Sequence, residues 1–452
     1  MKICVYVLED HAKKTYKNES YHTRLYAGMA VVVDIIRRAG YDVEYAGKST
    51  VHKYDVVLMS ITSDCDWWPF IAERIKWQKG NYKVIAGGAG VLNVRPFLSF
   101  VDYFVLGRAE GVIDKLITSM DKNIGFSHPS VIESSKFDIN KEYRINQVNE
   151  RYPYDIILEN GQVYREDIIG CNHKCLFCGY TWHRKSVLDD VFEYSGLWHG
   201  SADRERAMID LHNGIEVDFT KLRTTAIDGL SERLRFMVNK KITRDMLVEF
   251  LIKLHTSGKP HQVKFYNIIG YPTETEEDWW EFKEDIIRAD EQLAPSAKQT
   301  SILLHSTPFR PMPATPMACA PMSYRNYRGE IARVLGAGLK GNIFYQRKAI
   351  WAVESMGTES LPTVILSAIA WRGTEKDAEN VRKIACSKQF WSANSMVKQA
   401  TLEKYFDVKT LFGEFTPEKL PTRYLKSYAK VEKMWMPLSV YCASEQKAVL
   451  AE

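Results

Sequence analysis

Short β-branched runs alternate with amphipathic stretches throughout the first 120 residues of this chain. The strand-like runs are KICVYVL, YDVEYAG, YDVVLMSIT, KVIAGG and VDYFVLG. The segments whose apolar residues have helical spacing are AGMAVVVDIIRRAG, PFIAERIKWQKG and AEGVIDKLITSM. This alternation predicts a doubly wound parallel sheet, because each crossover between parallel strands packs a helix against the sheet. The expected fold class is therefore α/β, with residues 1–120 as the first domain.

Sheets of this kind bind ligands beyond the carboxyl ends of their strands. The residues at these ends are small or carry hydroxyls, and they are Ser60, Thr62, Gly87, Gly88 and Gly107. Glycines allow a large planar or phosphate-bearing ligand to approach the backbone, so we expect a cofactor-binding edge here. Ordinary turn chemistry accounts for any one of these residues equally well.

The remaining sequence divides into three further segments. Residues 121–150 are polar and aperiodic, and we expect them to form a linker. A second α/β region follows at 151–325, and it begins with a β-hairpin predicted by Asn160 and Gly161 in DIILENGQVYRED. Residues 326–452 have a mainly helical pattern.

The C-terminal segment is basic, with 19 Lys and Arg against 13 Asp and Glu, while the whole chain carries a net charge of +5. This balance favours an anionic substrate or partner, such as a nucleotide, a nucleic acid or a phosphorylated metabolite, although a solvated basic surface fits it as well. No run of 18 apolar residues occurs, so we expect no membrane span. The first residues lack a small-residue cleavage site, which favours a cytoplasmic protein.

The stretch IIGCNHKCLFCGYTW places Cys171, Cys175 and Cys178 within eight positions. Three thiolates with this spacing ligate three irons of a [4Fe–4S] cluster and leave the fourth iron open. A structural zinc ion is the alternative metal, with His173 or His183 as its fourth ligand. We favour the cluster, because the loop follows a strand-like segment and has an aromatic shield before its last cysteine.

Three downstream segments accompany the cysteine loop. They are TTAIDGLSERLRFMVNKKIT (224–243), VKFYNIIGYPTETEEDW (263–279) and SILLHSTPFRPMPATPM (301–317). Together with the cysteine spacing and Phe177, they resemble the radical S-adenosylmethionine (radical SAM) superfamily over residues 165–320. The first 120 residues resemble the cobalamin-binding domain that precedes the barrel in one branch of that superfamily.

The resemblance implies a partial (β/α)6-type barrel in which the open iron binds S-adenosylmethionine and an external reductant of the flavodoxin or ferredoxin type supplies one electron. It implies cofactor contacts for Phe177, Tyr180, Ser231, Glu232 and Gly270. For Ser231 and Glu232 the alternative is a helix N-cap followed by a solvated charge. Cobalamin is implied as a cofactor of the N-terminal domain, with loss of the cofactor and retention of the fold as the alternative.

Two features depart from the family's pattern. Only 45 residues separate the last cysteine from the segment at 224, too few for two βα units, so we expect an abbreviated barrel. Asp210 and His212 are the best stand-in for the segment that binds the amino group of S-adenosylmethionine. Asp10 and His11 follow the first strand but are adjacent, so the D-x-H-x-x-G motif that ligates cobalt is missing.

Four further residues have two interpretations each. Trp67 and Trp68 lie at a strand end and either cover a corrin face or belong to an aromatic core. His305 either faces the substrate or packs inside the fold. Arg310 either holds an anionic group of the substrate or lies at the surface.

The expected function is a radical SAM enzyme that acts on a small-molecule or nucleotide-type substrate. It is either a cobalamin-dependent methyltransferase or an enzyme whose 5′-deoxyadenosyl radical takes hydrogen from the substrate directly. A methylthiotransferase acting on nucleic acid is the second hypothesis, but it needs a further cluster on three N-terminal cysteines, and only Cys4 and Cys65 lie there. A zinc-containing nucleic-acid-binding protein is the alternative from another class.

Overall fold

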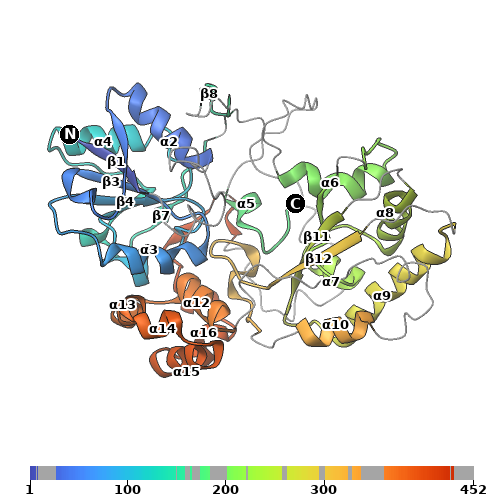
Figure 1. Ribbon diagram of the computed structural model, residues 1–452. Coiled ribbons are helices and arrows are strands. Elements are labelled where there is room, and N and C mark those ends of the chain that lie inside the picture. Colours follow the sequence, from blue (N-terminus) through green and yellow to red (C-terminus); the bar gives the residue numbers. More distant parts are fainter. Residues whose placement is uncertain are drawn as a thin grey trace.

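The computed structural model has three parts (Figure 1): a blue N-terminal sheet, a green and yellow α/β body beside it, and orange C-terminal helices below the first. The described residues are 1–6, 8, 27–148, 150–157, 163–164, 174–183, 201–219, 222–256, 262–294, 301–323, 328–336, 361–427 and 429–431. Among them, no helix combines the length and apolar character needed to cross a membrane.

The N-terminal sheet has the strand order β2-β1-β3-β4-β5-β6. Its strands are β1 (Ile3–Tyr6), β2 (Val43–Ala46), β3 (Val56–Ser60), β4 (Lys83–Gly87), β5 (Tyr103–Val105) and β6 (Val131–Glu133). β1 to β5 are parallel and β6 is antiparallel, so the predicted parallel sheet is confirmed over five strands. The predicted helices are α2 (Ala27–Arg38), α3 (Trp67–Arg74) and α4 (Ile113–Asp121).

Alternate residues of β1 face opposite layers of helices, as the two-residue period of a strand requires. Ile3 and Val5 pack in one apolar cluster with side chains of α2 and α4. Cys4 and Tyr6 pack in another cluster with side chains of α3. Burial on both faces explains why the predicted strands are almost continuously apolar.

The segment 121–150, which we expect to be a linker, contributes strands. β6 lies within it and forms the antiparallel edge beside β5. β7 (Tyr143–Arg144) also lies within it and pairs in parallel with β13 (Leu425–Lys426). This second pairing ties the C-terminal part of the chain to the N-terminal domain.

The second α/β body contains the parallel sheet β10-β11-β12, at the three places where the sequence predicts strands. The strands are β10 (Thr224–Ala226), β11 (Gln262–Ile269) and β12 (Ser301–Pro308), and the helices are α5 (Gly179–Trp182), α6 (Ser201–His212), α7 (Glu232–Met237), α8 (Arg244–Thr256), α9 (Glu276–Glu291) and α10 (Arg328–Gly336). β8 (Ile156–Ile157) and β9 (Val163–Tyr164) pair antiparallel, as the predicted hairpin requires, while its predicted turn at Asn160 and Gly161 lies outside the described residues.

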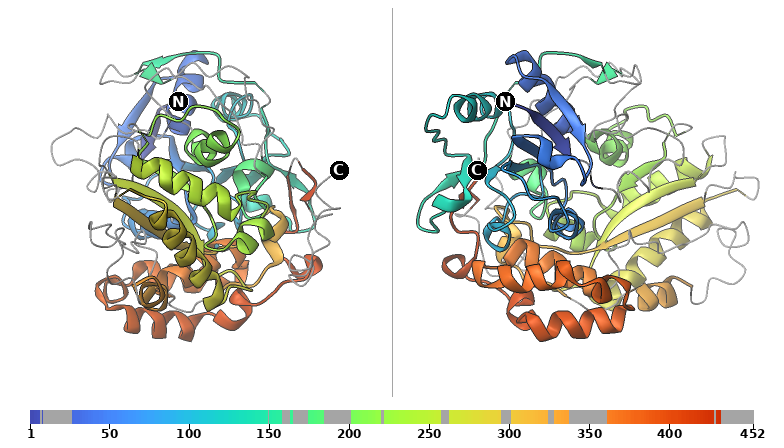
Figure 2. Two further views of the ribbon diagram at one scale, coloured as in Figure 1. Left: turned by 90° about the vertical axis from the view of Figure 1, so that its right-hand side faces the viewer. Right: turned by 60° about the vertical axis from the view of Figure 1, so that its left-hand side comes forward.

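Within the predicted C-terminal segment, the described residues 361–427 are mainly helical, as predicted. Its helices are α12 (Leu361–Arg372), α13 (Ala378–Cys386), α14 (Lys388–Ser392), α15 (Ser395–Tyr405) and α16 (Val408–Phe412). α12 is apolar on every side, and its side chains from Ile365 to the end of the helix are buried. A helix of this kind lies inside a core rather than on a surface. Figure 2 shows these helices below the N-terminal sheet in both views.

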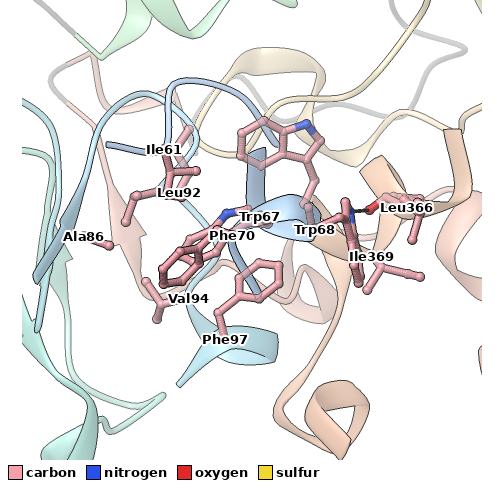
Figure 3. Packing of buried hydrophobic residues seen from close by; sticks show 14 of the residues in the cluster. Ile61, Trp67, Trp68, Phe70, Ala86, Leu92, Val94, Phe97, Leu366 and Ile369 are labelled. Carbon is pink, nitrogen blue, oxygen red and sulfur yellow. Dashed lines mark hydrogen bonds between the residues drawn. The ribbon is translucent and has the colours of Figure 1, made fainter. Parts of the chain in front are cut away.

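An aromatic core joins the N-terminal sheet to the C-terminal helices (Figure 3). Trp67 is fully buried and stacks on Phe97 with ring centroids 4.0 Å apart, and its Nε1 donates to the carbonyl of Gly90 at 2.9 Å. Trp68 donates its Nε1 to the carbonyl of Leu366 in α12 at 3.2 Å. Both tryptophans are therefore core residues.

Arg372, the last residue of α12, connects three segments of the chain through its buried guanidinium group. Its NH1 donates to the carbonyls of Leu411 at 3.1 Å and Gly413 at 2.8 Å. Its NH2 donates to the carbonyls of Ala318, at 3.0 Å, and Ala320. A planar guanidinium has five N–H donors, which suffice for these four carbonyls. The ammonium group of a lysine has only three donors.

We therefore expect Arg372→Lys to leave a buried carbonyl without a donor and to lower the free energy of unfolding by about 2–4 kcal/mol. Urea denaturation measures this change. Arg382→Lys, at an exposed position of α13, is the matched control and should change stability by less than about 0.5 kcal/mol. Equal stability of the two variants would contradict the role of Arg372.

Candidate functional site

The cysteine loop forms a tight turn ahead of α5. The structure describes Cys175, which is buried, and Cys178, which is partly buried, while Cys171 and His173 lie outside the described residues. The amide of Cys178 donates to the carbonyl of Cys175 at 3.1 Å, and Trp182 Nε1 donates to the same carbonyl at 2.8 Å. Two thiols carried on one turn suit joint ligation of a metal cluster. Among the described residues alone, no three metal-binding side chains gather.

Segments that follow the first and last strands of the β10-β11-β12 sheet hold this loop. The amide of Leu176 donates to the carbonyl of Val238 at 3.0 Å, and the Asn239 side chain donates to the carbonyl of Lys174 at 3.1 Å. On the other side, the amide of Met317 donates to the carbonyl of Leu176 at 3.3 Å. The turn after α7 and the loop after β12 thus clamp the loop from two sides.

Helix α5 packs closely on the loop after β12. A Cβ at Gly179 would lie 2.5 Å from His183 Cε1 and 2.6 Å from Met312 Sδ, so a larger residue here would displace these side chains. His183 Nε2 lies 2.9 Å from the carbonyl of Pro313 and 3.1 Å from that of Ala314. Since carbonyls only accept hydrogen bonds, this nitrogen carries the ring proton. With Nε2 protonated, Nδ1 of His183 carries the lone pair of the ring and is the nitrogen that could ligate a metal.

A buried ion pair lies in the turns that carry the cysteine loop. Lys240 is fully buried, and its Nζ lies 2.9 Å from Asp228 Oδ2. Asp228 follows β10 with a left-handed φ of 52°, and its carbonyl accepts from the Tyr271 hydroxyl at 2.7 Å. Asn239, which holds the cysteine loop, directly precedes Lys240. The ion pair therefore stabilises the turn that positions the cysteines.

Ser231 and Glu232, for which the resemblance implies contacts to S-adenosylmethionine, make helix-capping contacts. Ser231 is the N-cap of α7: its Oγ accepts from the amide of Leu234 at 3.2 Å and donates to Asp278 Oδ1 at 2.5 Å. Glu232 Oε2 accepts from the amide of Arg244, the first residue of α8, at 2.6 Å. These are the contacts of the helix-cap interpretation.

Gly270 follows β11 with φ of 79°, a left-handed conformation that favours glycine. The amides of Gly270 and Tyr271 donate to Glu274 Oε2, and Trp279 Nε1 donates to Glu274 Oε1 at 2.7 Å. Burial raises the pKa of Glu274 to about 7, although these three donors favour the charged form. The sequence GYPTET is therefore a turn in which the glutamate satisfies neighbouring amides.

The two faces of the β10-β11-β12 sheet differ in polarity. Val263, Phe265 and Ile269 of β11 lie on the face that packs against α8 and α9. Tyr266, His305 and Thr307 lie on the opposite face, which we call the inner face. The rings of Tyr266 and His305 are 5.1 Å apart at 78°, and Tyr266 and Thr307 are partly exposed. Polar side chains on this face suit a polar ligand.

The remaining predicted site residues lie in several places. Phe177 is partly buried against the large apolar cluster, and Tyr180 is partly buried in α5. Asp210 and His212 lie at the end of α6, where His212 Nδ1 is 3.7 Å from the exposed Glu249 carboxylate. Residues 9–26, which include Asp10 and His11, are outside the described part of the chain.

At the N-terminal sheet, the predicted ligand edge begins where β3 and β4 end side by side. Ser60, the last residue of β3, is the register partner of Gly87 in β4. Thr62 donates its Oγ1 to Asp66 Oδ2 at 2.6 Å, and the Thr62 amide donates to the same oxygen at 2.8 Å. Thr62 therefore stabilises the turn that leads into α3.

Two glycines of the same edge have left-handed conformations and touch other backbone segments. Gly88 has φ of 112°, and a Cβ there would lie 2.4 Å from the Ile61 carbonyl oxygen. Gly107 has φ of 84°, and its Cβ would lie 2.4 Å from the Asn146 carbonyl oxygen. Contacts within the chain are sufficient to require glycine at both positions.

Sequence reasoning missed three residues that support the site, Asp228, Lys240 and Glu274. Asp228 and Lys240 belong to the segment 224–243, but their spacing has no feature that signals a buried pair. Glu274 lies in the predicted turn motif, where a single acidic residue resembles any other solvated charge until its burial is known.

No family model matches the chain. An uncharacterized protein of Methanocaldococcus jannaschii, MJ0966, is 24% identical over 313 aligned positions, which cover 59% of this chain and 68% of that protein. Its name assigns no activity. The aligned region therefore covers more than half of this chain and about two thirds of the archaeal protein.

Two solved structures of the cobalamin-dependent S-adenosylmethionine radical enzyme OxsB are similar at a low level. The structure with aqua-cobalamin and S-adenosylmethionine bound has a TM-score of 0.25 and 9% identity, and the one with aqua-cobalamin bound has 0.23 and 10%. Each comparison covers 95% of this chain but only 59% of OxsB, so the chain spans less than two thirds of that enzyme. At these TM-scores the likeness carries no argument about function.

We expect Lys240→Met to leave the Asp228 carboxylate buried without its cation and to lower the free energy of unfolding by about 3–5 kcal/mol. Adding Asp228→Asn should recover part of this loss, since asparagine is neutral and tolerates the left-handed conformation. Urea denaturation measures both variants, with Lys409→Met at an exposed position of α16 as the control. If the double variant is no more stable than Lys240→Met, the pair does not act as described.

The protonation of Glu274 should make stability depend on pH. Its pKa of about 7 in the folded chain exceeds the ordinary value of 4.5, so the folded state retains a proton that the unfolded state has lost. The stabilisation from this group is therefore complete below pH 4.5 and is lost as the pH rises through 7. We expect the free energy of unfolding, relative to Glu274→Gln, to fall by about 3 kcal/mol over this window. A difference that does not change with pH would show that the three donors keep the carboxylate charged.

Proposed function

We propose that this protein is a radical SAM enzyme in which Cys171, Cys175 and Cys178 hold a [4Fe–4S] cluster and S-adenosylmethionine binds beside it. The observation that carries the proposal is the turn with two thiols, clamped between the segments that follow β10 and β12. Ligands of parallel sheets bind at this end of the strands. The thiol donors and their spacing on one turn fit a cluster with an open iron.

When bound, the cluster supplies one electron, received from a flavodoxin- or ferredoxin-type reductant, that splits S-adenosylmethionine into methionine and a 5′-deoxyadenosyl radical. The chain itself binds and orients S-adenosylmethionine, and it excludes water from the site. Leu176 and Trp182, on either side of Cys178, are buried in the large apolar cluster, and Phe177 packs against it. These side chains shield the turn from solvent, which protects a reactive intermediate from side reactions.

For S-adenosylmethionine, we place the adenine near the turn at Gly270 and near Tyr180. Gly270 has no Cβ, so a planar ring can approach the backbone there. Ser231 and Glu232 support this region by capping α7 and α8 rather than through direct contacts to the cofactor. In this proposal, substitution of Ser231 or Glu232 disturbs the cofactor site indirectly, by removing a capping contact at the start of α7 or α8.

For the substrate, we propose the inner face with Tyr266, His305 and Thr307 as the binding surface. Its polar side chains suit a small-molecule or nucleotide-type substrate. The basic composition of residues 326–452 supports an anionic group on that substrate and keeps a nucleic acid as a second substrate class. The reaction class is removal of a hydrogen atom from a substrate carbon, which converts the radical into 5′-deoxyadenosine.

The two other hypotheses have less support. A methylthiotransferase would need Cys4 and Cys65 as cluster ligands, but Cys4 is fully buried in β1 and burial raises its pKa to about 12. A thiol that stays protonated is a poor metal ligand. A zinc site would need Nδ1 of His183, or His173, as its fourth ligand, whereas the spacing of the three thiols and the apolar packing of Phe177 favour the cluster.

The test replaces each of Cys171, Cys175 and Cys178 with alanine in protein purified and reconstituted without oxygen. We expect each variant to lose the visible absorbance of the cluster and to form no 5′-deoxyadenosine above background from S-adenosylmethionine and a reductant, because each thiolate ligates one iron. Cys386→Ala, at an exposed position of α13, is the control and should behave as wild type. Wild-type protein that binds only zinc, or forms no 5′-deoxyadenosine when loaded, would refute the proposal.

A further inference from the structure

The carboxyl edge of the N-terminal sheet is covered by other parts of this chain. A cofactor bound by a sheet with this strand order lies over that edge, near the point where the order reverses at β1. The elements that contact the segments following β3 and β4 include α12, the loop after β12 and the segment 421–424.

Helix α12 lies directly on the segment that follows β3. Trp68 is 3% exposed and donates its Nε1 to the carbonyl of Leu366 at 3.2 Å. Cys65 precedes Trp68 by three positions, and its Sγ lies 3.7 Å from Ser367 Oγ of α12. Ile61, the first residue after β3, is fully buried. The space beyond this strand is therefore occupied by side chains and by the backbone of α12, as Figure 3 shows for Ile61, Trp68 and Leu366.

The segment that follows β4 is covered in the same way. The fully buried side chain of Asn93 donates to the carbonyl of Gly373, just beyond α12, at 2.8 Å. The amide of Val94 donates to the hydroxyl of Tyr424 at 3.1 Å, and this hydroxyl donates to the carbonyl of Leu92 at 3.3 Å. These polar groups are satisfied by the C-terminal part of the chain.

Arg310 connects this edge to the second α/β body. Its NH1 lies 2.7 Å from Asp64 Oδ2, 3.0 Å from Ser367 Oγ and 3.5 Å from Cys65 Sγ. Asp64 is buried, and the guanidinium provides its counter-charge. One arginine thus holds the N-terminal sheet, the loop after β12 and α12 together.

We infer that this edge is an internal docking surface for α12 and the loop after β12, and that the chain binds no cobalamin there. A corrin is a broad planar macrocycle, and the space that it would need above β3 and β4 is filled by Trp68 and α12. Gly88, which would otherwise mark a ligand site, is required by its contact with Ile61.

One consequence rests on the proposed function. Without a corrin to carry a methyl group, the 5′-deoxyadenosyl radical takes hydrogen from the substrate directly. The docking surface itself does not depend on the chemistry of the cysteines. An experiment can therefore refute the docking surface without refuting the proposed function, and the reverse.

The first test measures corrin retention. The full-length protein, reconstituted without oxygen, is incubated with excess aquacobalamin and desalted, and the absorbance of the protein fraction is recorded. We expect no retained corrin and no effect of added cobalamin on 5′-deoxyadenosine formation. Retention of one corrin per chain would overturn the inference, whether or not S-adenosylmethionine is cleaved.

The second test measures docking by hydrogen exchange of backbone amides in residues 61–68 and 365–373. We expect Arg310→Ala to accelerate exchange about tenfold in both segments, because a charge-assisted contact to a buried carboxylate is lost. Arg382→Ala, at the exposed position in α13, is the matched control and should leave both segments unchanged.

Should Arg310→Ala not fold, Ser367→Ala removes only one contact of the guanidinium and serves as the milder variant. We expect it to accelerate exchange in the same two segments by a smaller factor. Unchanged exchange in both segments, in whichever variant folds, would overturn the docking surface.

Discussion

The ion pair between Arg310 and Asp64 joins the carboxyl ends of two parallel sheets. Arg310 follows β12 and Asp64 follows β3, so the end at which each sheet would bind a ligand faces the other domain. Ser367 of α12 contacts the same guanidinium, which brings the C-terminal helices to the junction. This arrangement uses the edge of the N-terminal sheet for contact between domains and keeps the edge of the second sheet for the cysteine loop.

The cysteine loop depends on this junction through a short stretch of chain. The loop after β12 carries Arg310 near its start, contacts Gly179 through Met312, and reaches Leu176 through Met317. Prolines at 311, 313 and 316 restrict its backbone, since each fixes φ. The same restricted segment therefore contacts both the domain interface, through Arg310, and the cysteine loop, through Met312 and Met317.

Buried charge in this protein mainly stabilises turns. Lys240 and Asp228 fix the turns around α7, Arg372 serves carbonyls from two other segments, and Glu274 serves amides of its own turn. A buried charge is tolerated only where partners replace water. These groups are thus engaged with the chain, whereas Tyr266 and Thr307 on the inner face remain partly exposed to a ligand.

The sequence by itself determined the strands of the N-terminal sheet, because strands buried on both faces are almost continuous apolar runs that need no partner to be recognised. For β10, β11 and β12, the prediction came from the resemblance of three segments to a known family. The sequence also determined the spacing of the cysteines and the glycine turn at Gly270. Only the tertiary structure decided that β6 and β7 lie in the segment 121–150, since strands of two or three residues are too short to show a period. It alone decided what covers the N-terminal edge, because Arg310 and Asp64 are 246 positions apart and pair by proximity in the fold, which leaves no local pattern in the sequence.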